Sequence, residues 1–210
     1  MKNTTKIAVI GGTGKSGKYL IQQLLKTGYR FRLLVRNLEK FKIESPQMEI
    51  VHGDVANYDT VSSLVKGCDA VLSTLGIGIP HSPPTIFSTA SRNIIRAGIK
   101  RYIVITGLHV DTPIDKKSPK VKFGTDWMCQ NYPKITADRQ LEYKLLTESE
   151  VGWTLLRLPL ITLTDLQKEV AIRLEDCLGD DISATDLANF LITQLDDHTY
   201  LRKAPFIANI

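Results

Sequence analysis

Short apolar runs rich in β-branched residues recur along the chain, at residues 7–10, 31–35, 48–51, 70–75, 102–105 and 154–158. Within each run the hydrophobic residues are nearly continuous and do not alternate with polar ones. This pattern is typical of strands in a parallel sheet whose two faces are both covered. We therefore predict a buried strand at each run.

Segments with the period of a helix lie between these runs. The positions that share a helix face are Leu20, Leu24 and Thr27; Val61, Leu64 and Val65; Phe87, Ala90, Ile94 and Ile95; and Leu141 and Leu145. Glycines follow them, where a helix end favours a left-handed residue, at Gly28, Gly67, Gly98 and Gly152. The repeated order of strand and helix predicts an α/β fold, a Rossmann-type doubly wound parallel sheet, with its ligand crevice at the carboxyl ends of the strands.

The whole chain, residues 1–210, is predicted to form a single domain with small C-terminal elements on the substrate side. Residues 108–133 interrupt the rhythm and are predicted to form a long lid-like loop or substrate wall. Ser183 and Asp186 have the spacing of a capping box, which marks a late helix. Residues 205–210 predict a last edge strand.

Composition excludes several classes of protein. The net charge is +5, but the basic residues are spread out, which favours an anionic small ligand over nucleic acid. Cys68, Cys129 and Cys177 lack the CxxC spacing of a disulfide framework or a zinc site. The first apolar run is too short for a signal peptide, and no stretch approaches the roughly 18 apolar residues of a membrane span. We expect a cytoplasmic protein with neither a metal nor a membrane partner.

The stretch GGTGKSGKY, which follows the first strand, places four glycines within residues 11–17. A triphosphate-binding loop of the form GxxxxGK[ST] does not fit, because one frame has Val9 in place of glycine and the other has Tyr19 in place of the hydroxyl residue. The stretch does match GxGxxG and GxxGxxG, which hold a dinucleotide pyrophosphate at a helix N-terminus. An ordinary turn from strand to helix is the alternative. The candidate cofactor residues are Gly11, Gly12, Thr13, Gly14, Lys15, Ser16 and Gly17.

The residue at the end of the second strand indicates which dinucleotide binds. NAD sites carry an acidic residue about 20 positions after the glycines, whereas here Arg36 lies 19 residues after Gly17. A guanidinium group pairs well with the 2′-phosphate of NADP. NADPH/NADP⁺ is therefore the predicted cofactor, with Lys15 as a further cation. A solvated arginine at a strand end is the alternative.

Motifs along nearly the whole chain resemble the atypical short-chain dehydrogenases/reductases, in particular the small NAD(P)H-binding group of NmrA-like proteins, biliverdin IXβ/flavin reductases and quinone reductases. These motifs are IAVIGGTGKSG, LLVRN, VHGDV, VLSTLG, YIVITG, SEVGWTLLRLP and DISATDLANFL. The resemblance implies that Asp54 binds the adenine amino group, that Val55 packs on the ring, and that Thr106 and Pro159 lie near the nicotinamide. The residues that it places beside the riboses are Ser73, Thr74, Leu75 and Gly76.

The chain departs from this family where its members carry catalytic groups. Alignment on Glu142 puts Lys134 and Asp138 at the positions of the Tyr-x-x-x-Lys dyad. Gly107 stands where serine is frequent, and Leu160 stands where biliverdin/flavin reductases have histidine. Carbonyl reduction through that proton relay is therefore not expected. Hydride transfer to a flavin, quinone or similar planar acceptor needs mainly positioning.

Candidate catalytic residues lie in the loops that follow the central strands. Thr106 and His109 follow the fifth strand and His81 follows the fourth, and histidine titrates in a range that suits proton transfer. For the two histidines, a purely local role in the loop is the alternative. An aromatic wall for a planar substrate, or ordinary packing, is predicted for Phe123, Trp127 and Met128.

Two functions follow from these features. The first is an NADPH-dependent oxidoreductase, a flavin or quinone reductase without the dyad. The second is a non-catalytic NADP(H)-binding sensor of the NmrA-like type, which the same missing residues would suit. Nucleic-acid binding and an epimerase role are weaker alternatives. The acceptor and the oligomeric state are not predicted.

Overall fold

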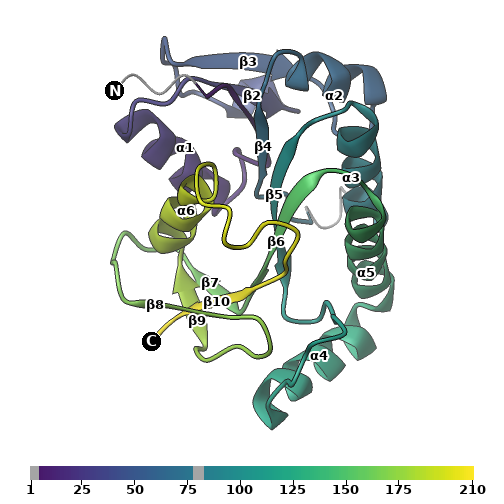
Figure 1. The fold of residues 1–210 in the computed structure, drawn as a ribbon. Helices are drawn as coiled ribbons and strands as arrows, with labels where there is room; N and C mark the ends of the chain where they lie inside the picture. The colour runs from purple at the N-terminus through teal and green to yellow at the C-terminus, as the bar shows by residue number, and fades with distance from the viewer. Residues whose placement is uncertain (1–4, 78–82) are drawn as a thin grey trace.

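A computed structural model describes residues 5–77 and 83–210 and shows a sheet between two layers of helices (Figure 1). The order of the strands in the main sheet is β3 (Met48–His52), β2 (Phe31–Val35), β1 (Ile7–Ile10), β4 (Ala70–Ser73), β5 (Arg101–Gly107), β6 (Gly152–Leu158), β10 (Phe206–Asn209) and β8 (Val170–Arg173). A second, small sheet pairs β7 (Leu160–Thr162) with β9 (Asp181–Ser183).

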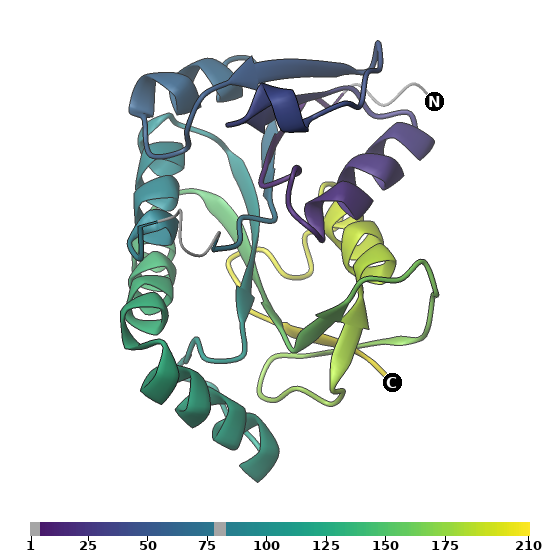
Figure 2. The ribbon, with the colours of Figure 1, turned by 180° about the vertical axis from the view of Figure 1, so that it is seen from behind.

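Helices cover both faces of the main sheet (Figures 1 and 2). The helices are α1 (Gly17–Lys26), α2 (Tyr58–Val65), α3 (Ile86–Arg96), α4 (Pro119–Asn131), α5 (Pro133–Glu148) and α6 (Ala184–Thr193), with a short 3₁₀ turn, η1, at Leu38–Lys40. One core lies under α1 and α6 and the other under α2, α3 and α5. Because side chains alternate along a strand, Ile7 and Val9 enter the first core and Ala8 and Ile10 the second.

The parallel pairing of β3, β2, β1, β4, β5 and β6 confirms the predicted Rossmann-type fold. Every strand predicted from the apolar runs is present, with ends shifted by up to two residues. Gly28, Gly67 and Gly98 have positive φ, as predicted for helix ends. Gly152 does not end a helix and is instead the first residue of β6.

The C-terminal part of the chain both confirms and corrects the predictions. Ser183 caps α6, since its Oγ accepts a hydrogen bond from the Asp186 backbone N–H at 3.0 Å. The last strand, β10, is not an edge strand, because it lies between β6 and β8. The strands β7, β8 and β9 were not predicted, because each has only three or four residues and half-buried positions, too few to show a periodic pattern.

The segment 108–133 is not a continuous loop, because residues 119–131 form α4. Pro119 occupies its first turn, where a missing N–H costs nothing and the fixed φ favours the helix. Only Val121 and Thr125 of this helix are buried, so its hydrophobic period is too weak to detect in the sequence. The irregular part is confined to residues 108–118.

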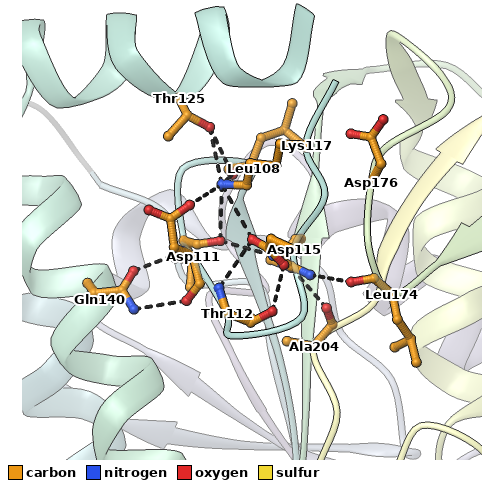
Figure 3. A network of polar contacts seen from close by, with 12 residues as sticks. Leu108, Asp111, Thr112, Asp115, Lys117, Thr125, Gln140, Leu174, Asp176 and Ala204 are labelled. Carbon is orange, nitrogen blue, oxygen red and sulfur yellow. Dashed lines mark hydrogen bonds and ion pairs between the residues drawn. The ribbon is translucent and has the colours of Figure 1, made fainter. Parts of the chain in front are cut away.

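Residues 108–118 are held by a buried cluster of ion pairs and hydrogen bonds (Figure 3). Arg157 of β6 is fully buried, and its Nη1 lies 2.7 Å from both carboxylate oxygens of Asp115. The same guanidinium group donates to the carbonyl oxygens of Val110 at 3.1 Å, Leu174 at 2.8 Å and Ala204 at 2.9 Å. One side chain thereby joins the segment to two other parts of the chain.

Lys117 holds the segment from the side of α4 (Figure 3). Its buried Nζ lies 2.5 Å from Asp111 Oδ1 and donates to the Leu108 carbonyl at 2.7 Å and to Thr125 Oγ1 at 3.3 Å. With Arg157 it fixes the backbone on both sides of residue 109. This arrangement favours a fixed wall over a mobile lid.

Removing the Asp115 carboxylate is expected to destabilise the fold strongly, because Arg157 would keep a buried charge without its partner. We expect Asp115→Ala to lower the free energy of unfolding by about 3–5 kcal/mol, measured by urea denaturation. The matched control is Glu175→Ala, whose carboxylate pairs with Lys116 at the surface and is expected to contribute about 1 kcal/mol or less. Equal losses in the two variants would contradict this account of the cluster.

Candidate functional site

A cleft of about 660 Å³ lies at the carboxyl ends of β1, β2 and β4. Most residues predicted to bind the cofactor line it, namely Gly11, Thr13, Gly14, Lys15, Ser16, Arg36, Asp54, Val55, Thr74, Leu75 and Gly76. Five predicted residues lie outside the lining, namely Gly12, Gly17, Ser73, Thr106 and Pro159. Residues predicted from separate motifs thus line the same cleft.

The glycines allow the loop after β1 to come close to its neighbours. Gly11 has φ +78°, and a Cβ atom there would lie 2.6 Å from the backbone nitrogen of Leu75. A Cβ atom at Gly17 would lie 2.2 Å from the Gly11 carbonyl oxygen, and one at Gly12 would lie 2.7 Å from the Leu33 side chain. These are the three requirements of a dinucleotide loop: a tight turn, close backbone approach and close packing of helix against strand.

The N-terminus of α1 suits an anion. Ser16 occupies the capping position without a side-chain hydrogen bond to the helix, and the first turn contains no acidic residue. The first backbone N–H groups of a helix lack partners within it and carry a partial positive charge. With the exposed Lys15 beside them, they form a site that fits a phosphate group.

Arg36 and Asp54 face each other across one end of the cleft. Arg36 follows the last residue of β2, and its Nη1 lies 3.8 Å from Asp54 Oδ2, with both side chains about half exposed. Asp54 Oδ1 also accepts a hydrogen bond from the Ala56 backbone N–H at 2.8 Å, so this residue shapes its turn as well. Val55 is buried in the core and still contributes to the cleft wall.

Ser73 and Thr74 differ in their access to the cleft. Ser73 is fully buried, and its Oγ accepts from the Leu75 backbone N–H at 3.4 Å. Thr74 lines the cleft and donates from Oγ1 to the Ile10 carbonyl at 3.4 Å. Of this predicted stretch, therefore, only Thr74, Leu75 and Gly76 form part of the wall.

A row of buried charged residues on α5 was not predicted from the sequence. Arg139 forms an ion pair with Glu142 at 2.7 Å and donates to the carbonyl oxygens of Ile105 and Leu75, both at 2.9 Å. It thereby joins the ends of β4 and β5. Leu141, predicted on the buried face, is 39% exposed. The helix turns Asp138, Arg139 and Glu142 inward, which a search for apolar periodicity cannot detect.

The two residues aligned with the dyad do not form a proton relay. Asp138 is buried, and its Oδ2 accepts hydrogen bonds from the backbone N–H groups of Phe87 at 2.9 Å and Ser88 at 3.2 Å, where α3 begins. Lys134 is exposed in the first turn of α5. Asp138 thus caps a neighbouring helix.

Thr106 and His109 lie at the carboxyl end of β5 and are 4% and 8% exposed. Thr106 Oγ1 and His109 Nε2 have no hydrogen-bond partner among the described residues. The imidazole ring of His109 lies against Gly107, where a Cβ atom would be 2.6 Å from both Cε1 and Nδ1. The ring therefore fills the space of a side chain at position 107.

The surroundings of His109 keep its imidazole neutral. Burial is the main cause that lowers the pKa of His109 to about 4, and the positive charges of Arg139 and Lys117 lower it further, while Asp111 acts in the opposite direction. At neutral pH the ring can form hydrogen bonds but carries no charge. His81, the other histidine considered, lies outside the described residues.

Neither Thr106 nor His109 lines the cleft, and the remaining predicted residues also lie outside its lining. Pro159 is half-buried at the junction of β6 and β7, and Leu160 after it is 73% exposed. Phe123 and Trp127 lie on the exposed face of α4, and neither lines the cleft. Within residues 5–77 and 83–210, no helix is long and apolar enough to cross a membrane, and no cluster of residues could hold a metal ion.

The fold and the cleft together define a dinucleotide-binding protein of the Rossmann class. Residues 11–198 match a family described as NAD(P)H-binding, and the chain belongs to this family. The match covers both the glycine loop and α6.

Solved structures of low sequence identity share the fold. ChuY, an anaerobillin reductase from Escherichia coli O157:H7, is 15% identical with a TM-score of 0.80, over 98% of this chain and 97% of that one. A short-chain dehydrogenase/reductase from Veillonella parvula, solved in complex with NADP, is 18% identical with a TM-score of 0.77, over 98% and 94%.

Relatives of higher identity match only a part of the chain. An isoflavone reductase homolog, A622-like, from Nicotiana tabacum is 36% identical over 81 residues, which are 34% of this chain and 26% of that protein. Photosystem II assembly factor Ycf39 from Trieres chinensis is 35% identical over 69 residues, or 32% and 22%. The chain thus spans about a quarter of the length of the relatives that it matches.

The depressed pKa of His109 predicts a pH dependence of stability. Between about pH 6.5 and 4 the unfolded chain binds a proton at this residue and the folded chain does not, so stability falls as the pH is lowered through that window. The slope from this residue is at most about 1.4 kcal/mol per pH unit. Urea denaturation at a series of pH values should show this slope in the native protein and a reduced one in His109→Gln. Identical slopes would contradict the prediction.

Proposed function

We propose that the protein is an NADPH-dependent reductase that transfers a hydride to a flavin, quinone or similar planar acceptor without a Tyr/Lys dyad. The observation that carries the proposal is the glycine loop and Arg36 in the lining of the cleft. The positions of the dyad, which lie on α5 outside that lining, hold Lys134 and Asp138. The membership of the NAD(P)H-binding family supports a nicotinamide cofactor. The reductases among the similar proteins support the reaction class.

The residues of the cleft fit NADPH at three places. The pyrophosphate would be held by the loop backbone and the N-terminus of α1, with Lys15 adding positive charge. Arg36 would pair with the 2′-phosphate, and Asp54 and Val55 would meet the adenine. When bound, the nicotinamide supplies the hydride.

The chain itself would contribute positioning and exclusion of water. No tyrosine in the sequence is followed by lysine four residues later. The polar groups at the end of β5 are a neutral imidazole and a hydroxyl, which orient a ligand better than they protonate it. A conjugated acceptor can take its proton from water, so such a site suffices for it.

Turnover of NADPH with a planar acceptor tests the proposal. We expect the purified protein to consume NADPH when FMN, riboflavin or menadione is added, followed by the absorbance of the reduced nicotinamide. Gly17→Ala should abolish both NADPH binding and turnover, because its Cβ atom would lie 2.2 Å from the Gly11 carbonyl oxygen. Gly124→Ala, which meets nothing within 4 Å, is the matched control and should retain both.

The outcomes separate a reductase from a sensor. NADPH binding by calorimetry without turnover of any acceptor would contradict the reductase and favour an NADP(H)-binding regulator. Absence of NADPH binding would contradict both.

Replacing Arg36 tests the preference for NADPH over NADH. We expect Arg36→Ala to weaken NADPH binding by about 10- to 100-fold, the range for losing a charge-assisted hydrogen bond, and to change NADH binding little. Arg30→Ala is the charge-matched control and should leave both affinities unchanged, because this exposed arginine precedes β2 and so lies at the opposite end of that strand from Arg36. Equal losses for NADPH and NADH in Arg36→Ala would show that this arginine does not read the 2′-phosphate.

A further inference from the structure

We propose that His109 is the group that hydrogen-bonds the planar acceptor, and that Lys117 and Arg157 are positioning residues that hold it at the end of β5. The inference rests on the proposed function and extends it to the acceptor side of the site. The ligand class is a conjugated planar molecule with a carbonyl oxygen or ring nitrogen at its rim.

The position of the imidazole is set by the absence of a side chain at Gly107. Gly107 is the last residue of β5, and its φ is not positive, so other residues could adopt the same backbone. A Cβ atom there would overlap the His109 ring, at 2.6 Å from Cε1 and Nδ1. Position 107 of the strand therefore carries no side chain, and the imidazole ring of His109, two residues later, occupies that space.

The polar atoms at this place lack partners in the described chain. His109 Nε2 and Thr106 Oγ1 are both buried without a hydrogen bond. Burying an unsatisfied polar atom costs about 1–3 kcal/mol, so a ligand group that reached these two atoms would recover that cost by pairing with them. The Nη atoms of Arg139 already donate hydrogen bonds to Glu142 and to the carbonyl oxygens of Ile105 and Leu75.

The buried cluster of Figure 3 holds the two residues that flank His109 in the sequence. Lys117 Nζ donates to the carbonyl of Leu108, and Arg157 donates to that of Val110, so the residues on both sides of His109 are anchored. These contacts come from separate elements, β6 and the segment before α4. The backbone at position 109 cannot shift without breaking a buried charged contact.

The chemistry that follows is orientation by a neutral hydrogen bond. An uncharged imidazole can donate to a carbonyl oxygen or accept from a ring N–H, depending on its tautomer. No proton transfer is required of it. The charged groups around the ring are Arg139, Lys117 and Asp111, and they favour the neutral form.

Four variants separate hydrogen bonding from packing. His109→Ala and Gly107→Ala should each lower kcat/KM for menadione by about 3- to 10-fold, the first by removing the ring and the second by displacing it. In the double variant Gly107→Ser with His109→Ala, a hydroxyl enters the vacated space and should restore part of the loss. Gly107→Ala with His109→Ala fills the same space with a methyl group and should not.

Binding provides a readout independent of turnover. NMR signals of the His109 imidazole, identified by their loss in His109→Gln, should shift when menadione or FMN is added to the NADP⁺ complex, while those of the exposed His198 stay in place. Lys117→Met should raise the acceptor KM without changing NADPH affinity, and Lys117→Arg should recover much of that loss. Lys116→Met is the matched control, because that lysine is exposed, and it should behave as the native protein.

Several results would overturn the inference. A full shift of the His109 signals on NADP⁺ alone, with none added by menadione or FMN, would assign the ring to the cofactor. Native-like acceptor kinetics in His109→Ala, or equal kinetics for the serine and alanine double variants, would remove the proposed hydrogen bond. NADPH binding with no turnover by the native protein would defeat the proposed function, and absence of any acceptor-induced shift would then defeat this inference too.

Discussion

Carbonyl groups at the carboxyl ends of buried strands need hydrogen-bond donors, and in this protein two buried guanidinium groups supply them. Arg139 bonds the carbonyls of Ile105 and Leu75, and Arg157 bonds those of Val110 and two residues further along the chain. Each group has a carboxylate partner that offsets its buried charge, Glu142 and Asp115 respectively. The edge of the sheet that holds the cleft is therefore braced by charge-assisted hydrogen bonds rather than by apolar contacts alone.

Much of the fold could be predicted from the sequence because the parallel sheet leaves a strong local pattern. Continuous apolar runs such as residues 7–10 are typical of buried parallel strands, and glycines such as Gly28 mark helix ends through their backbone conformation. The helix α4 escaped detection because only two of its residues are buried. The buried charges of α5 escaped detection because Asp138 and Arg139 bond backbone groups of α3, of β5 and of the residues after β4, which are distant in sequence.

The candidate site likewise has one part that could be predicted from the sequence and one part that could not. The glycine loop and Arg36 could be named in advance, since their chemistry depends on short spacing and on the end of one strand. The contact between Gly107 and His109 could not, because it depends on how the loop folds back on the strand. Ser73 was predicted beside a ribose, and its full burial places it outside the cleft lining, which a motif match alone does not distinguish.

The place of β10 has a consequence for how the chain reaches its folded state. Residues 206–209 lie inside the sheet, parallel to β6 on one side and antiparallel to β8 on the other. Until they have been synthesised, β6 and β8 each present an unpaired edge, and Arg157 lacks the Phe206 ring on which it rests at 3.5 Å. Sheet assembly on this side therefore has to follow the synthesis of residues 206–209, and it depends on contacts between residues far apart in sequence.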